Sequence, residues 1–188
     1  NIKLRLLGKH NVLNAAAALT VCLNLGLNQN IIKKSLEKFS GVQRRMTKIF
    51  TKNKNDFYDD YAHHPTEIAS ILEGVKNVYQ NRFIISVFEP HRYSRVLSLK
   101  KEFAKSFNKS NLVLLCPIFG AGEKKNSKFN ALEFGKLISK HSRSQVIVIK
   151  DYKELEKFFK KNLISDEIII GMGAGSISKH MRGLKYIL

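Results

Sequence analysis

Ionisable side chains crowd into one short segment of the chain. Residues 59–67 read Asp-Asp-Tyr-Ala-His-His-Pro-Thr-Glu, between an apolar strand-like run and a helical pattern. The first turn of a helix attracts anions, because its N–H groups are free and the helix dipole is positive there. A helix cap beside a solvated loop would account for a lone Asp or His. This many polar side chains in one turn instead favours a functional site.

A second polar segment contains a pair of arginines. Residues 89–95 read Glu-Pro-His-Arg-Tyr-Ser-Arg and follow the next apolar run. Arg92 and Arg95 lie three residues apart, so their side chains can converge on one face of a helical turn. Paired guanidinium groups bind a carboxylate or a phosphate in bidentate geometry. The alternative is a surface helix start with ordinary salt bridges. We favour function, because both segments follow neighbouring strands.

Three further segments give weaker signals. Residues 171–176, Gly-Met-Gly-Ala-Gly-Ser, resemble a phosphate-binding turn but fall short of G-x-G-x-x-G, so tight strand–helix packing is an equally good interpretation. Residues 120–123, Gly-Ala-Gly-Glu, lie in a long loop that could form a mobile rim. Asn11 and Asn14 could both face one ligand, such as a purine edge. Equally, His10 and Asn11 could cap a helix, with Asn14 on its surface.

Two helices are predicted at the start of the chain, before the strands. Residues 11–25 are rich in Ala and Leu, and Gly26 is suited to end that helix in the left-handed conformation. Asn28 can cap a second helix, whose apolar residues recur at helical spacing. The Ser40-Gly41 pair interrupts that pattern.

From Val42 onward, strand-like and helical patterns alternate. The predicted strands are 45–50, 57–60, 83–88, 112–116, 146–149 and 168–170. One helix is predicted to begin at Pro65, because proline suits the first helical position. Three more helices are predicted at 97–107, 131–140 and 152–161. This rhythm predicts an α/β fold with a doubly wound, mostly parallel sheet. In such sheets ligands bind beyond the carboxyl ends of the strands, where both polar segments fall.

Composition narrows the class of protein. The 188 residues are 44% hydrophobic, enough to fill the core of one ordinary domain. The formal charge of +18 suggests nucleic acid, but 25 of the 33 basic residues are lysines spread over every segment, so we expect no nucleic-acid partner. The apolar runs are too short to cross a bilayer, so we expect no membrane insertion. Cys22 and Cys116 lie in apolar stretches, which favours free thiols in a reducing cytoplasm.

Five motifs, in this order and spacing, resemble those of the Mur ligase family. The similarity runs from about Leu7 to the final helix. The motifs are Gly-Lys-His-Asn-Val-Leu-Asn-Ala-Ala-Ala (8–17), Gly-Val-Gln-Arg-Arg (41–45), Asp-Asp-Tyr-Ala-His-His-Pro (59–65), His-Arg-Tyr-Ser-Arg (91–95) and Met-Gly-Ala-Gly (172–175). The third and fourth look most like those of the family's L-alanine-adding members.

The resemblance implies that 1–41 end a central ATP-binding domain and that 42–188 form a Rossmann-like carboxyl-terminal ligase domain. No G-x-x-x-x-G-K-[ST] occurs in the chain, and it starts at Asn1, so we expect a fragment whose P-loop lies in missing sequence. The implied reaction, part of peptidoglycan synthesis, joins L-alanine to UDP-N-acetylmuramate through an acyl phosphate. ATP with Mg²⁺ is then bound mainly by the missing domain. A recycling ligase that attaches peptide to UDP-N-acetylmuramate is the alternative, disfavoured by 91–95.

Residue roles also follow from the resemblance. The residues implied in ATP binding are His10, Asn11, Asn14, Arg45 and Asp60. Those implied in binding the amino acid are Tyr61, Arg92 and Arg95, with the arginines holding the carboxylate of free alanine. His63 or His91 could assist deprotonation of the amine, since imidazole titrates near neutral pH. No residue is implied as a metal ligand.

Three positions depart from the family pattern. Met46 stands where an aromatic residue is common, Glu89 where a glutamine is more familiar, and Ser176 where an acidic residue is usual. The last change weakens any role assigned to the glycine-rich turn.

Overall fold

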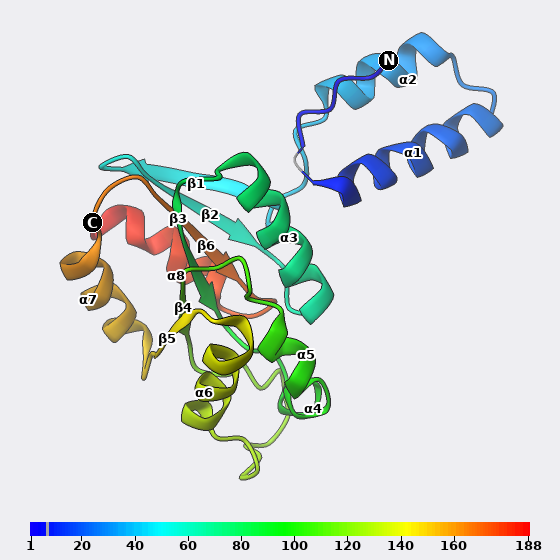
Figure 1. The fold of residues 1–188 in the computed structure, drawn as a ribbon. Helices are drawn as coiled ribbons and strands as arrows, with labels where there is room; N and C mark the ends of the chain where they lie inside the picture. Colours follow the sequence, from blue (N-terminus) through cyan, green and yellow to red (C-terminus); the bar gives the residue numbers. More distant parts are fainter. Residues whose placement is uncertain (7) are drawn as a thin grey trace.

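The computed structural model describes residues 1–6 and 8–188, apart from the side chains of Lys9 and His10. A six-stranded sheet in the order β1-β2-β6-β3-β4-β5 forms its centre (Figure 1). The strands are β1 (Thr47–Lys52), β2 (Asn55–Asp60), β3 (Phe83–Phe88), β4 (Leu112–Leu115), β5 (Gln145–Val148) and β6 (Glu167–Met172). Edge strand β1 pairs antiparallel with β2, and the other neighbours pair in parallel. The predicted mostly parallel α/β sheet is therefore confirmed.

Helices cover both faces of this sheet. They are α3 (Pro65–Val78), α4 (Tyr93–Ser98), α5 (Lys100–Lys105), α6 (Ala131–Ser142), α7 (Tyr152–Asn162), α8 (Ile177–Gly183) and the short 3₁₀ helix η1 (Leu184–Tyr186). One core lies between the sheet and α3, α5 and α6, and the other lies between the sheet and α7 and α8 (Figure 1). In β3, Ile84 and Phe88 join the first core, whereas Ile85 and Val87 join the second. Successive side chains of a strand point to opposite faces, so β3, which is covered on both faces, is apolar at every position except Ser86.

Two helices precede the sheet and stand beside it as a hairpin (Figure 1). α1 (Lys9–Asn24) is followed by Gly26 with a φ of 75°, as predicted for a left-handed cap. α2 (Gln29–Lys38) begins at Asn28, whose side chain accepts hydrogen bonds from the N–H groups of Asn30 and Ile31. Several apolar residues of this hairpin are exposed, including Val12, Leu13 and Ile31.

Two predicted elements differ clearly from the structure. The strand predicted at 45–50 begins at Thr47, because Arg44 and Met46 have φ angles of 61° and 45°, which a strand cannot contain. The single helix predicted at 97–107 is two short helices, α4 and α5, separated at Leu99. The predicted division of the chain into 1–41 and 42–188 stays a prediction.

No helix in the described part of the chain is long and apolar enough to span a bilayer. Cys22 and Cys116 are both free thiols. Burial raises the pKa of the Cys116 thiol, which therefore packs as a small apolar group.

Candidate active site

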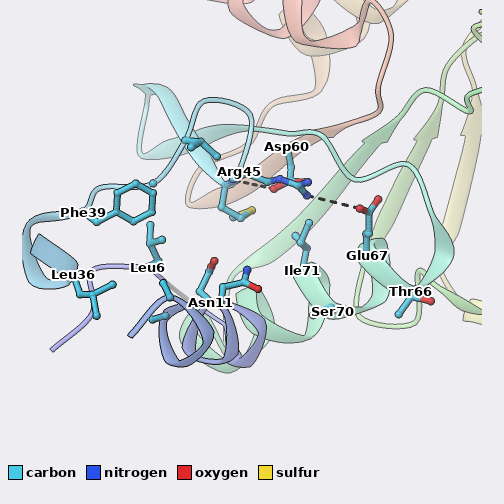
Figure 2. Close-up of a pocket in the computed structure, with 16 residues that line it drawn as sticks. Leu6, Asn11, Leu36, Phe39, Arg45, Asp60, Thr66, Glu67, Ser70 and Ile71 are labelled. Carbon is cyan, nitrogen blue, oxygen red and sulfur yellow. Dashed lines mark hydrogen bonds and ion pairs between the residues drawn. The ribbon is translucent and has the colours of Figure 1, made fainter. Parts of the chain in front are cut away.

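A cavity of about 620 Å³ lies between the helical hairpin, the linker after it and the start of α3 (Figure 2). Its walls are mostly apolar, with a few convergent polar groups, as is usual for small-molecule sites. The lining residues are Leu6, Asn11, Asn14, Ala15, Ala18, Leu36, Phe39, Gly41, Val42, Arg45, Met46, Asp60, Thr66, Glu67, Ser70 and Ile71. Four of the five residues expected at the ATP site thus line one cavity, although they come from three separate segments.

The fifth, His10, lies outside the residues whose side chains are described. Its backbone belongs to the first turn of α1. Asn11 does not occupy the N-cap position of α1. This residue is already inside the helix, after an N-cap at Gly8 that has no side-chain hydrogen bond. Asn11 is therefore not the capping residue.

Asp60 fixes the linker to the end of β2. Its side chain is 1% exposed, and its two oxygens accept hydrogen bonds from the N–H groups of Met46 and Ala62, each at 2.7 Å. Burial raises the pKa of this carboxyl to about 6, against the opposing effect of those two hydrogen bonds. Because both oxygens are engaged by backbone donors, Asp60 holds the turn that carries Arg45.

Asp59 belongs to a different face from its neighbour. Its Oδ2 accepts hydrogen bonds from Ser178 Oγ at 2.6 Å and from Arg182 at 3.0 Å, both on α8. The segment 59–67 therefore does not act as one cluster. Alternation along β2 sends Asp59 under α8 and Asp60 towards the cavity.

Two other members of that segment cap α3. The N–H of Thr66 donates to His64 Nδ1 at 3.4 Å, and Glu67 Oε2 accepts from the N–H groups of His63 and His64. These contacts form a reciprocal capping box, so helix capping alone accounts for the presence of His64 and Glu67. Burial acts to raise the pKa of Glu67, but these hydrogen bonds and the nearby His63 and Arg45 outweigh it, so the pKa is lowered.

The remaining side chains, Tyr61 and His63, meet the second polar segment. The His63 ring lies 5.1 Å from the Tyr61 ring and 5.7 Å from the His91 ring, in edge-on geometry both times. His63 Nδ1 lies 2.9 Å from the Tyr61 carbonyl oxygen, which fixes the orientation of the imidazole. The two segments thus share one end of the sheet, as expected from strands that run in parallel. The strands they follow, β2 and β3, are not the neighbours that were predicted, because β6 lies between them.

Arg95 and Arg92 are placed differently from each other. Arg95 lies in the first turn of α4, and its guanidinium is 3.4 Å from His91 Nδ1. Arg92 is exposed and precedes the helix with a φ of 68°, so the regular helical turn expected for the pair holds only for Arg95. Burial, and then the positive charges led by Arg95, lower the pKa of His91, which favours a neutral imidazole.

Sequence reasoning missed two residues that complete this region. Phe119, in the loop after β4, stacks on the His91 ring with 5.6 Å between centroids and is 39% exposed. Arg44 lies 4.7 Å above the Tyr61 ring and donates a 2.6 Å hydrogen bond to the Gly173 carbonyl oxygen. The position of Phe119, directly before the Gly120–Gly122 turn, could have indicated that it belongs to the site. Nothing in the sequence distinguished Arg44 from the adjacent Arg45.

The loop expected as a mobile rim is anchored to α4 through Glu123. Ser94 donates to the Glu123 carboxylate through both its hydroxyl, at 2.5 Å, and its N–H, at 3.1 Å. These contacts tie the loop to α4 beside Arg95.

The glycine-rich turn at 173–175 is a packing feature. A Cβ on Gly175 would lie 2.5 Å from Glu89 Oε1 and 2.5 Å from the Phe119 ring, so any larger residue would collide with both. Tight packing, one of two interpretations left open by the sequence, is therefore the arrangement seen. In the described part of the chain, no group of three or more His, Cys, Asp or Glu side chains could hold a metal ion.

The sequence matches the family model described as the Mur ligase glutamate ligase domain over residues 44–175. It is 50% identical, over its whole length, to the UDP-N-acetylmuramate–L-alanine ligase of Pelagibacter ubique (strain HTCC1062), and it covers 40% of that relative. Identity to the enzyme of the same description from Ruthia magnifica is 38%, over 94% of this chain and 38% of the relative. The chain thus spans about two fifths of the length of the curated relatives it matches.

Two solved structures are also similar to this chain. The crystal structure of the UDP-N-acetylmuramate–alanine ligase from Thermotoga maritima superposes with a TM-score of 0.80 at 28% identity, covering 98% of this chain and 39% of that one. A murein peptide ligase from Psychrobacter arcticus superposes with a TM-score of 0.72 at 22% identity, covering 99% of this chain and 38% of that one, a likeness of fold alone.

Proposed function

The chain belongs to the Mur ligase family, and from this premise we propose that it is the part of an ATP-dependent ligase that presents L-alanine to activated UDP-N-acetylmuramate. The observation that carries the proposal is the adjacency of two sites joined by one turn. Asp60 lines the cavity, and the next residue, Tyr61, packs against the imidazole cluster formed by His63 and His91. A nucleotide and an amino acid bound there would lie next to each other. The division at residue 41 into the end of an ATP-binding domain and a ligase domain is part of the proposal.

The cavity is the proposed nucleotide side. Its apolar walls suit a purine, and the amides of Asn11 and Asn14 lie on one helix face at the spacing needed to bind its edge. Arg45 at its rim would reach the phosphates, in competition with its ion pair to Glu67 at 3.8 Å. Asp60 would act by holding this turn in place. The Mg²⁺ that accompanies ATP would be held mainly by the part of the ligase outside this chain, as the family resemblance implies.

The cluster around His91 is the proposed amino-acid side. Arg95, with Arg92, would hold the carboxylate of L-alanine by charge-assisted hydrogen bonds, leaving the amine free to react. The amine nitrogen would attack the carbonyl carbon of the muramoyl phosphate, the bond to the phosphate oxygen would break, and phosphate would leave. His63 or His91 would accept the proton lost by the amine. The lowered pKa of His91 keeps its ring available as an acceptor at neutral pH.

The strong positive charge would also serve these substrates. A formal charge of +18 attracts UDP-N-acetylmuramate and ATP, which are both anionic. The proposed reaction is a cytoplasmic step in peptidoglycan synthesis, consistent with two free cysteines.

Phosphate release by a full-length protein carrying this chain would test the proposal. With ATP and UDP-N-acetylmuramate present, L-alanine should stimulate release strongly, whereas a cell-wall tripeptide with a free amino terminus should not. Reactions lacking UDP-N-acetylmuramate are the control, because they report uncoupled ATP hydrolysis. Stimulation by the tripeptide and not by L-alanine would assign the chain to peptide recycling instead.

A further inference from the structure

Glu89 is a buried acidic residue that the proposed chemistry does not use. It directly follows β3, two residues before His91, and its side chain is 1% exposed. A buried carboxylate is costly unless donors surround it, so its partners show what it does. They come from α7 and α8, which pack on the face of the sheet opposite α3 (Figure 1).

Four donors converge on this carboxylate. Oε2 accepts hydrogen bonds from the Tyr152 hydroxyl, from Ser176 Oγ at 2.6 Å and from the Ser176 N–H at 3.2 Å. Oε1 accepts from the Ile177 N–H at 3.2 Å. Burial, and next the hydrogen bond to Glu89, raise the pKa of Tyr152, so this hydroxyl keeps the proton that it donates. The Tyr152 ring also stacks on His180 of α8, with 3.5 Å between centroids.

Glu89 therefore replaces a local helix cap. Ser176 occupies the N-cap position of α8, yet its side chain caps none of the helix N–H groups. The oxygens that receive the N–H groups of Ser176 and Ile177 come from Glu89, a residue distant in the sequence. Two positions that depart from the family pattern, Glu89 and Ser176, are thus in direct contact.

This contact reaches the imidazole cluster through the loop after β4. The turn at Gly175 packs so closely that a Cβ there would meet both Glu89 and Phe119. Phe119 in turn stacks on His91 and exchanges backbone hydrogen bonds with Pro90 and Arg92. A shift of the 173–176 turn would move Phe119, and with it His91.

We propose that Glu89 is a positioning residue, whose carboxylate clamps the start of α8 and Tyr152 and thereby holds His91 and Arg95 in place for the amino acid. The inference rests on the proposed function for its consequence in catalysis. The clamp itself depends only on the hydrogen bonds of Glu89, so it can be measured without assaying the reaction.

Glu89→Gln is the informative substitution, because it keeps the size of the side chain and replaces one oxygen by an NH₂ group. Each carboxylate oxygen accepts from a backbone N–H, so either orientation of the amide sets a donor against a donor. In the full-length protein, the KM for L-alanine should rise on the order of tenfold while the KM for ATP stays within about twofold.

Moving the carboxylate across the contact should reverse the effect. Ser176→Asp alone sets two carboxylates against each other and should also raise the KM for L-alanine. In the double variant Glu89→Gln/Ser176→Asp, the carboxylate introduced at position 176 can cap α8 and accept from the amide introduced at position 89. The KM should then return towards that of the unchanged protein. A double variant no better than Glu89→Gln would overturn the inference.

A matched control separates positioning from general damage. Glu167 is also buried, at 4% exposed, and accepts a 3.3 Å hydrogen bond from Ile164 at the opposite end of the sheet. Glu167→Gln should leave the KM for L-alanine unchanged. Equal rises with Glu167→Gln and Glu89→Gln, or equal rises for L-alanine and ATP, would reduce Glu89 to a structural residue and overturn the proposal.

Hydrogen–deuterium exchange gives a readout independent of activity. Glu89→Gln should accelerate exchange in 90–95 and 173–178, and the double variant should restore protection. If the unchanged protein does not use L-alanine, the proposed function fails while this measurement still decides the clamp. Unaltered exchange in both segments would reject the clamp whatever the substrate is.

Discussion

The rings of His63 and His91 lie 5.7 Å apart, although each residue follows a different strand of the sheet. β2 and β3 are not neighbours, because β6 lies between them. The loops after these strands nevertheless meet above the end of β6, with Tyr61 and Phe119 flanking the pair. The meeting of these two imidazoles at one end of the sheet is therefore a consequence of the strand order.

Arg95→Ala should weaken binding of L-alanine. Loss of one charge-assisted hydrogen-bond pair removes about 1.5–3 kcal/mol, so the KM for L-alanine should rise roughly tenfold to over a hundredfold. The KM for ATP should change little. Steady-state phosphate release by the full-length protein measures both. Arg143→Ala, at the far end of α6, is the matched control, and an unchanged KM for L-alanine in Arg95→Ala would exclude this arginine from the site.

Asn14→Ala should weaken binding of ATP instead. The amide lines the cavity between α1 and α3, and the loss of a neutral hydrogen bond removes about 0.5–1.5 kcal/mol. The Kd for ATP should therefore rise about two- to tenfold, as measured by calorimetry on the full-length protein. Asn24→Ala, at the other end of α1, should leave the Kd unaltered. Equal effects of both substitutions would show that the cavity is not the nucleotide site.

His91 should titrate below the ordinary range of histidine. Burial disfavours its charged form, and Arg95 adds repulsion, so its pKa is lowered. Removing the guanidinium in Arg95→Ala takes away one source of that repulsion, and the pKa of His91 should then move upward. NMR titration of the imidazole nitrogens measures both values. If His91 accepts the amine proton, the acid limb of kcat/KM should move upward with it. A pKa for His91 that is indifferent to Arg95 would contradict the contact.

Asp56 should protect the fold against acid. It forms ion pairs with Lys48 and Arg82, each at 2.6 Å, and although burial acts to raise its pKa, these partners lower it to about 2. Because the folded pKa lies below the unfolded value of 3.8, the stabilisation is present above pH 3.8 and is lost as pH falls towards 2. The magnitude is about 2 kcal/mol at neutral pH.

Urea unfolding of the 188-residue chain at several pH values would measure this effect. Asp56→Asn should destabilise at pH 7 and lose its difference from the unchanged chain near pH 2. Asp166→Asn is the matched control, since Asp166 contacts the same arginine from a position that is two-thirds exposed. Exposed ion pairs contribute little, so a loss as large as that of Asp56→Asn would refute the assignment.

The sequence by itself determined the elements and the edge of the sheet at which chemistry would gather. Asn28 and Pro65 start helices because their side chains suit those positions, which is a local property. Apolar runs such as Phe83–Phe88 identify buried parallel strands, and parallel strands direct the loops that follow them to one edge. The family followed from motifs at fixed spacing.

Only the tertiary structure decided which side chains meet. Asp59 and Asp60 are alike in sequence, yet one lies beneath α8 and the other lines the cavity, because the pairing of β2 with its neighbours sets which face each side chain takes. The contact of Glu89 with Ser176, and the place of Phe119 against His91, join distant segments across the strand order. Such contacts depend on long-range packing, which leaves no periodic trace in the sequence.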